Sequence, residues 1–203
     1  MPPRKLSHEF QETIADSLTH ILDTRGAVAA PARAAIVAAP MEGWTDEADR
    51  LSSEEMVEIV NSPARPTVED IGKLPCPIDD KDKGVYMCLI SGPTPEHGVH
   101  AYIGSATGTD GMEGRIKQHL DPASLKTHPD SPFYRLLHDD EGRTVRWLTL
   151  FKIEGSYSEA DDDIRTHDRL LCVMMEHVYH RLFRTWCAKV RRESPIWNQA
   201  TPV

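Results

Sequence analysis

Two short hydrophobic runs, residues 85–90 and 99–103, form the clearest pattern along this chain. The segment between them, SGPTPEHG, is rich in proline and glycine and therefore favours a turn. Two apolar runs on either side of a turn predict a β-hairpin. Tyr86 lies in the first run and Tyr102 in the second, each close to a glycine. Because side chains alternate between the two faces of a strand, both rings can lie on one face of this hairpin.

Further elements are predicted after the hairpin. Residues 111–120 have an amphipathic pattern that predicts a helix, which Asp-Pro at 121–122 ends. Residues 144–153 are rich in β-branched and aromatic residues and predict a third strand. Residues 161–192 predict a long helix, with aspartates at its start and basic residues at its end, as the helix dipole favours. The second half of the chain is therefore predicted to combine three strands with helices.

The first 80 residues predict a helical extension. Residues 6–24 carry an apolar stripe at helical spacing, and residues 52–61 begin with serines that can cap a second helix. Between them, residues 27–40 are either a flexible linker or a short helix broken by its prolines. We therefore divide the chain into a helical extension or linker, residues 1–80, and a second domain, residues 81–203.

The charge of the chain is unevenly distributed. The net charge is −9, and residues 1–80 carry 7 basic and 15 acidic side chains, which leaves 16 basic and 17 acidic side chains for the rest. The extension is thus acidic and the second domain nearly neutral, so the net charge does not exclude phosphate binding by that domain. Without a run of 18 apolar residues or a signal-peptide pattern, we expect no membrane association and an intracellular protein, of the nucleus or the cytoplasm.

Glu176 is the most unusual polar position in the long predicted helix. It lies within the apolar sequence LLCVMMEHVYH, where a carboxylate is costly unless it is paired or binds a cation. It is therefore either exposed, paired with an arginine, or a ligand for a hard cation such as Mg²⁺ or Mn²⁺, which prefers oxygen donors. Arg115 and His119 are four residues apart and share one helical face, where a guanidinium suits phosphate and an imidazole can exchange protons.

These residues together resemble a known family. GVY at 84–86, YIG at 102–104, Arg115 followed by His119, Glu176 on a later helix and Asn198 near the end follow the order of the motifs of GIY-YIG nucleases. The resemblance covers about residues 82 to 200. It implies an α+β fold with a small three-stranded antiparallel sheet flanked by helices, preceded here by the extension. It also implies a metal-dependent endonuclease that hydrolyses phosphodiester bonds in DNA, with RNA as the alternative, using Mg²⁺ or Mn²⁺.

The resemblance also assigns roles to residues. Arg115 is expected to stabilise the transition-state charge, Glu176 to bind the metal, and Tyr102 to orient a water or a phosphate. The general base is either Tyr86 or His119. Asn198 is expected to brace the site. The expected substrate-binding residues are Gly104, Ser105 and Thr107.

Two questions remain open, one about each part of the chain. The second domain is either an active nuclease or a weak or inactive nucleic-acid-binding module or adaptor in a larger repair or processing complex. The extension covers one face of that domain, competes with DNA for the active-site face, or docks a protein partner.

Overall fold

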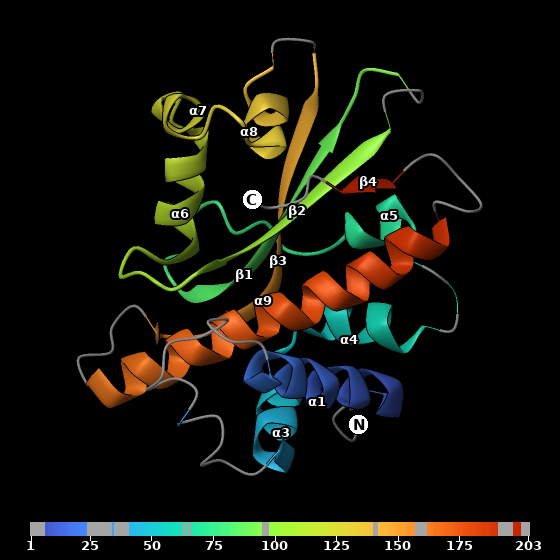
Figure 1. Ribbon diagram of the computed structural model, residues 1–203, viewed down its shortest axis with the longest axis vertical. Coiled ribbons are helices and arrows are strands. Elements are labelled where there is room, and N and C mark those ends of the chain that lie inside the picture. Colours follow the sequence, from blue (N-terminus) through green and yellow to red (C-terminus); the bar gives the residue numbers. More distant parts are fainter. Residues whose placement is uncertain are drawn as a thin grey trace.

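The computed structural model has an α+β architecture in which a small sheet is flanked by helices (Figure 1). It describes these residues: 7–23, 34, 41–62, 64, 66–94, 98–139, 142–156, 162–190 and 197–199. Three strands of the sheet are antiparallel, as expected, and are β1 (Lys83–Ser91), β2 (Val99–Ala106) and β3 (Thr144–Ile153). A short fourth strand, β4 (Trp197–Gln199), which the sequence did not predict, adds a parallel edge beside β2. The strand order is β3-β1-β2-β4.

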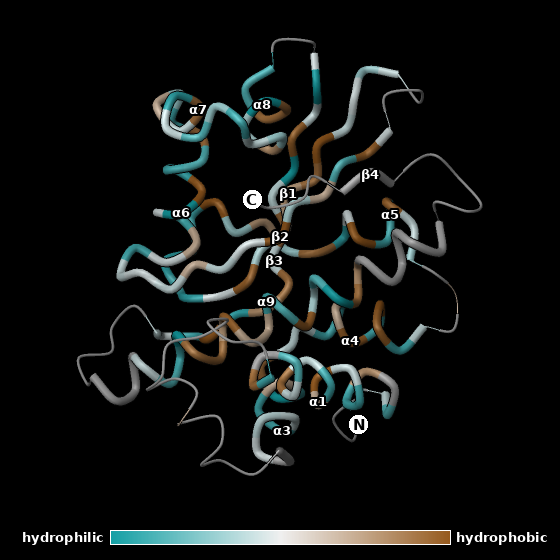
Figure 2. The backbone as a smooth tube through the Cα atoms, viewed as in Figure 1, coloured by the Kyte–Doolittle hydropathy of each residue, from teal (hydrophilic) through white to brown (hydrophobic). Residues whose placement is uncertain are grey.

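The central position of β1 in the sheet explains why residues 85–90 form an uninterrupted hydrophobic run. Val85, Met87 and Leu89 point into one hydrophobic core, and Tyr86 and Cys88 point into a second one on the opposite face. Both faces of the strand are thus covered by helices, so no side of it has to be polar. Figure 2 shows these hydrophobic stretches of the strands at the centre of the molecule.

One face of the sheet is covered by the helices that follow the hairpin. These are α6 (Gly111–Leu120), α7 (Ala123–Thr127) and α8 (Pro132–Leu137). Met112 and Ile116 of α6 and Phe133 of α8 pack against Tyr86 and Trp147 of the sheet. This smaller core is where the sequence-predicted tyrosines and histidine lie.

The opposite face is covered by the long helix α9 (Asp162–Val190) and by the N-terminal helices behind it (Figure 1). The N-terminal helices are α1 (His8–Asp23), α3 (Met41–Leu51), α4 (Glu54–Asn61) and α5 (Val68–Ile71). Phe10, Ile14 and Leu18 of α1 are buried in the same core as Val178 of α9 and Met87 of β1. The described part of the extension therefore packs against α9 and along the outer edge of β3.

The helices predicted within the extension are confirmed at residues 8–23 and 54–61. Ser53 caps α4 by accepting a hydrogen bond from the backbone N–H of Met56, as its sequence suggested. Most of the linker predicted at 27–40 lies outside the described residues. Among the described residues, no helix combines the length and the apolarity that crossing a membrane requires.

Candidate active site

The register of the hairpin places both tyrosines on the face that α6 and α8 cover. Tyr86 pairs with Gly104 and Cys88 pairs with Tyr102, so the two tyrosines are diagonal neighbours on one face. Their ring centroids are 6.4 Å apart. Tyr86 is fully buried, whereas Tyr102 is partly exposed and stacks on Phe133 at 3.9 Å.

The two motif glycines allow close approach at this point of the sheet. A Cβ on Gly104 would lie 2.6 Å from the hydroxyl oxygen of Tyr86, and one on Gly84 would lie 2.3 Å from the carbonyl oxygen of Phe151. Real Cβ atoms do not come this close to neighbouring atoms. Gly104 therefore makes room for the Tyr86 hydroxyl, a role in the site that needs no contact with a substrate.

His119 lies beneath the two phenols and is itself buried, with 1% of its surface exposed. Its Nε2 lies 2.6 Å from Oη of Tyr86, and its Nδ1 lies 2.8 Å from Oη of Tyr134, a residue of α8. Burial, reinforced by the positive charge of Arg115, lowers the pKa of His119 to about 3. The imidazole is therefore neutral at physiological pH, and both of its nitrogens are engaged by phenols.

Arg115 reaches the same cluster from one turn earlier on α6. It is exposed, donates a hydrogen bond of 3.0 Å to Gln118, and acts on the hydroxyl of Tyr86 through its charge. Burial raises the pKa of Tyr86, and the charge of Arg115 opposes this. Burial also raises the pKa of Tyr102 to about 12, and the negative charge of Glu176 adds to the effect. Both phenols are therefore protonated at neutral pH, and a positive charge faces them at the surface.

Glu176 approaches from the other side, on α9, and meets the sheet at the open part of the β2 edge. In the described part of the chain, β4 pairs with β2 only at residues 99–101, so β4 does not cover the edge beside Ser105. The Ser105 hydroxyl donates to Oε2 of Glu176, and the backbone of Ser105 also bonds this carboxylate. Burial raises the pKa of Glu176, while these bonds and the charge of Arg115 oppose the rise. The carboxylate and the guanidinium therefore act on the same two phenols from opposite sides.

The surroundings of Glu176 fit a hard cation held by one carboxylate. Its side chain is 28% exposed, and Oε1 lies 3.8 Å from Nε2 of His180, too far for a hydrogen bond. No group of three or more His, Cys, Asp or Glu side chains within the described residues could hold a metal ion. Mg²⁺ needs no such group, because it usually keeps several waters and takes one or two carboxylates.

The remaining predicted residues have different positions. Thr107 is partly exposed just after β2. The hydroxyl of Ser105, which we expected at the phosphate, is bonded to Glu176. Asn198 lies in β4 opposite His100, but its side chain lies outside the described part of the structure. Sequence reasoning missed Tyr134, and no motif signals it, because its contact with His119 depends on how α8 folds back over α6.

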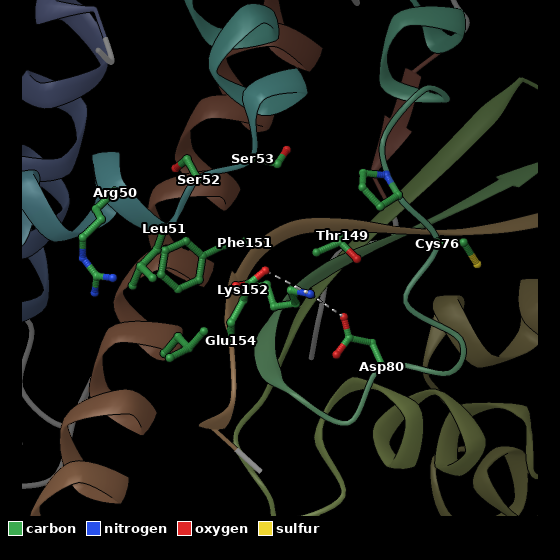
Figure 3. A pocket seen from close by; sticks show the side chains of 12 residues that line it. Arg50, Leu51, Ser52, Ser53, Cys76, Asp80, Thr149, Phe151, Lys152 and Glu154 are labelled. Atoms are coloured by element: carbon green, nitrogen blue, oxygen red, sulfur yellow. Dashed lines mark ion pairs between the residues drawn. The ribbon is translucent and has the colours of Figure 1, made fainter. Parts of the chain in front are cut away.

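A cavity of about 430 Å³ lies elsewhere, at the outer edge of β3 (Figure 3). It is lined by the end of α3, the start of α4 and the segment before β1, and none of the predicted site residues lines it. The Nζ of Lys152 lies between the carboxylates of Asp80 and Glu154, 3.4 Å from an oxygen of the first and 3.7 Å from an oxygen of the second. Both cations that line this cavity, Lys152 and Arg50, are thus paired with carboxylates nearby, Arg50 with Glu47 at 3.5 Å.

Comparisons of the chain with protein-family models, with curated proteins and with solved structures found no match. What the site does is therefore inferred from its residues and their geometry.

Proposed function

We propose that this chain is a metal-dependent endonuclease that hydrolyses phosphodiester bonds in DNA through a GIY-YIG-type site. The observation that carries the proposal is the meeting of five side chains from four elements, three of them consecutive and the fourth, α9, distant in the sequence. Two phenols from β1 and β2, a guanidinium and an imidazole from α6, and a carboxylate from α9 bond to one another or act on one another electrostatically. These side chains are Tyr86, Tyr102, Arg115, His119 and Glu176.

The proposed role of Arg115 is to bind the scissile phosphate. It is exposed, permanently charged and shaped to donate to phosphate oxygens, so it can stabilise the negative charge that develops there in the transition state. Glu176, positioned by Ser105, is the residue that would hold Mg²⁺ or Mn²⁺. When bound, such an ion supplies charge stabilisation at the leaving oxygen.

Tyr86 and His119 were alternative general bases, and we propose that they act in series. Tyr102 is the partly exposed phenol and lies beside Tyr86, with their ring centroids 6.4 Å apart, and Tyr86 hydrogen-bonds His119 at 2.6 Å. The proton of the attacking water would pass to Tyr102, the proton of Tyr102 to Tyr86, and the proton of Tyr86 to Nε2 of His119. A neutral imidazole is the group in this series that can accept a proton, since both phenols start protonated.

Cleavage of DNA by the full-length protein tests the proposal. Supercoiled plasmid, branched DNA, single-stranded DNA and RNA are incubated with Mg²⁺ or Mn²⁺, and products are resolved on gels. We expect Arg115→Ala and Glu176→Gln to lower the rate at least about a hundredfold while circular dichroism shows an intact fold. Matched controls are Arg135→Ala, an exposed arginine of α8, and Glu154→Gln, an exposed glutamate. Cleavage that survives both site substitutions would reject the proposal.

One observation favours a second function, nucleic-acid binding without turnover. Tyr86 and His119 are 0% and 1% exposed, so neither is open to an attacking water in this conformation. A module that binds through Arg115 without cutting would keep its affinity for DNA in the presence of metal and release no product. Fluorescence anisotropy with labelled DNA, run beside the cleavage assay, separates the two functions.

A further inference from the structure

Tyr134 of α8 holds the inner nitrogen of His119, although it belongs to no motif. Its Oη lies 2.8 Å from Nδ1 of His119, on the side of the ring opposite Tyr86. It is 9% exposed, and its ring stacks with two further histidines, His128 at 5.1 Å and His138 at 6.3 Å between ring centroids. The Nε2 of His138 lies 3.0 Å from the carbonyl oxygen of His119 and donates to it, which ties α8 to the end of α6.

The partners of Tyr86 fix the direction of the hydrogen bonds around His119. The positive charge of Arg115 acts on the Tyr86 hydroxyl and favours the arrangement in which the lone pairs of the phenol oxygen, not its proton, face the guanidinium. The hydroxyl proton of Tyr86 is then available for Nε2 of His119, which must be unprotonated to accept it. Because the imidazole is neutral, its proton lies on Nδ1 and is donated to the oxygen of Tyr134.

We propose that Tyr134 is a positioning residue that holds His119 in its Nδ1–H form, so that Nε2 presents a lone pair to Tyr86. This inference deepens the proposed function and rests on it for its catalytic meaning. The arrangement follows the general logic of catalytic triads, in which a third group orients the base and selects its tautomer. Here the third group is a neutral phenol, so it selects the tautomer without adding a charge.

A purely structural role for Tyr134 would consist of filling the core beside Phe133 and closing α8 over α6. Replacement by phenylalanine keeps that role, because it removes only the hydroxyl. If the hydroxyl selects the tautomer, Tyr134→Phe leaves Nδ1–H without a hydrogen-bond acceptor. The Nε2–H tautomer then becomes the more stable one, because its N–H can donate a hydrogen bond to the oxygen of Tyr86. Nε2 then no longer accepts a proton from Tyr86.

The tautomer of His119 is read directly from its ring ¹⁵N chemical shifts in full-length, ¹⁵N-labelled protein at neutral pH. We expect the wild type to show a protonated Nδ1 and an unprotonated Nε2, and Tyr134→Phe to move His119 towards the Nε2–H form. The control is Ser17→Ala, which also removes a buried hydroxyl but in α1, where it donates to the backbone of Thr13. It should leave His119 unchanged. A wild-type His119 in the Nε2–H form, or an unchanged tautomer in Tyr134→Phe, would overturn the inference.

The rate of DNA cleavage gives the second readout and separates this inference from the proposed function. If the wild type cleaves, Tyr134→Phe should lower kcat by roughly ten- to a hundredfold with little change in KM, as loss of a partner that orients a functional group typically does. Unchanged kcat in that variant would overturn the catalytic role. If the wild type does not cleave, the proposed function fails, and the ¹⁵N shifts still decide whether Tyr134 selects the tautomer.

Discussion

At the scale of residues, the centre of the candidate site is held by neutral groups, and the charges lie at its rim. Tyr86, Tyr102 and His119 are all kept in their uncharged forms by burial. Arg115 and Glu176 act on them from opposite sides. Neutral groups at the centre avoid a buried unpaired charge in the resting protein, which would be costly.

Alanine in place of Gly104 should distort this centre. The new Cβ would lie 2.6 Å from Oη of Tyr86 and 2.9 Å from its Cζ, so the phenol must move and its 2.6 Å bond to His119 is disturbed. We expect a loss of about 1–3 kcal/mol in the free energy of unfolding, the usual cost of overpacking a core, measured by urea denaturation. Gly108→Ala is the matched control, because a Cβ there meets nothing within 4 Å. Equal stability of the two variants would contradict the close contact.

His119 should make the protein less stable in mild acid. Its pKa falls from 6.5 to about 3 on folding, so the unfolded chain binds a proton in this window that the folded chain does not. Stability contributed by the neutral imidazole is therefore present above pH 6.5 and is lost as the pH falls towards 3. Between pH 7 and pH 5 the loss from this one group should be about 2 kcal/mol.

The measurement is the difference in unfolding free energy between pH 7 and pH 5, taken for the wild type and for His119→Gln. The variant is expected to be less stable at both pH values but to lose about 2 kcal/mol less between them. His128→Gln, an exposed histidine, should retain the wild-type pH dependence. If His119→Gln loses as much unfolding free energy between pH 7 and pH 5 as the wild type does, this imidazole is not held neutral by the fold.

The sequence could identify the members of this site but not their partners. The order of the motifs, together with the alternation of strand residues, indicated that Tyr86 and Tyr102 share a face, and the register of the hairpin confirms it. The bonds from Ser105 to Glu176 and from Tyr134 to His119 join residues 71 and 15 positions apart. Neither follows from periodicity, because each depends on where one element lies against another.

At the scale of elements, long and regular patterns were predictable and short elements were not. The third strand predicted at 144–153 and the helix predicted at 111–120 have the same bounds in the structure. By contrast, α3, α5, α7 and β4 were not predicted. Among these, α5, α7 and β4 have three to five residues each, too few to show a hydrophobic period. α3 has 11 residues and a polar sequence, MEGWTDEADRL, whose buried Trp44 and Ala48 give little signal.

The β-bulge between β1 and β3 is hydrogen-bonded by Tyr179, a residue of α9. The register shifts between Val85 and Tyr86, opposite Leu150, whose carbonyl oxygen accepts a 3.0 Å hydrogen bond from the hydroxyl of Tyr179 on α9. The side chain of Ser52, whose hydroxyl donates to the carbonyl oxygen of Ala48, also lies beside this hydroxyl. Tyr179 is fully buried. It therefore joins α9 to the irregular part of β3 and to the extension.

Tyr179→Phe should lower the free energy of unfolding by about 1–3 kcal/mol, because it leaves a buried carbonyl without its donor. Chemical denaturation measures the loss, and hydrogen exchange of the β3 amides near the bulge should increase with it. Ser52→Ala removes one neighbouring hydroxyl and keeps the bond to Leu150, so it should cost less. A fully stable Tyr179→Phe protein would mean that the bulge does not need this donor.

At the scale of the whole molecule, the extension and the sheet share one hydrophobic core. Phe10 and Trp44 from the first 80 residues are buried in the same cluster as Leu148 of β3 and Phe183 of α9. The division at residue 80, predicted from charge and composition, therefore has no counterpart in the packing of the described residues. It stays a prediction, as do the docking of a protein partner and competition with DNA by the extension.

The shared core predicts that the two parts unfold together. Phe10 is 2% exposed, and its ring lies 6.1 Å from that of Tyr179 on α9. Phe10→Ala should therefore cost about 3–5 kcal/mol, and the loss should reach the sheet, since removing an aromatic side chain from a core leaves a cavity that its neighbours share. Hydrogen exchange with mass spectrometry measures this separately for peptides of α1 and of β1. Both sets should lose protection by the same free energy.

The control for this experiment is Leu120→Ala, at a side chain that is 44% exposed, which should change protection by less than about 0.5 kcal/mol. If α1 alone loses protection in Phe10→Ala, the extension is a separate cooperative unit, and its deletion becomes a clean test of whether it restrains cleavage. If α1 and β1 change together, deletion would open the core that the extension shares with Val85, Met87 and Leu89 and unfold the sheet that carries the tyrosines. In that case any influence of the acidic extension on DNA must be tested by charge-neutralising substitutions on its exposed face, at Glu54 and Glu55 of α4.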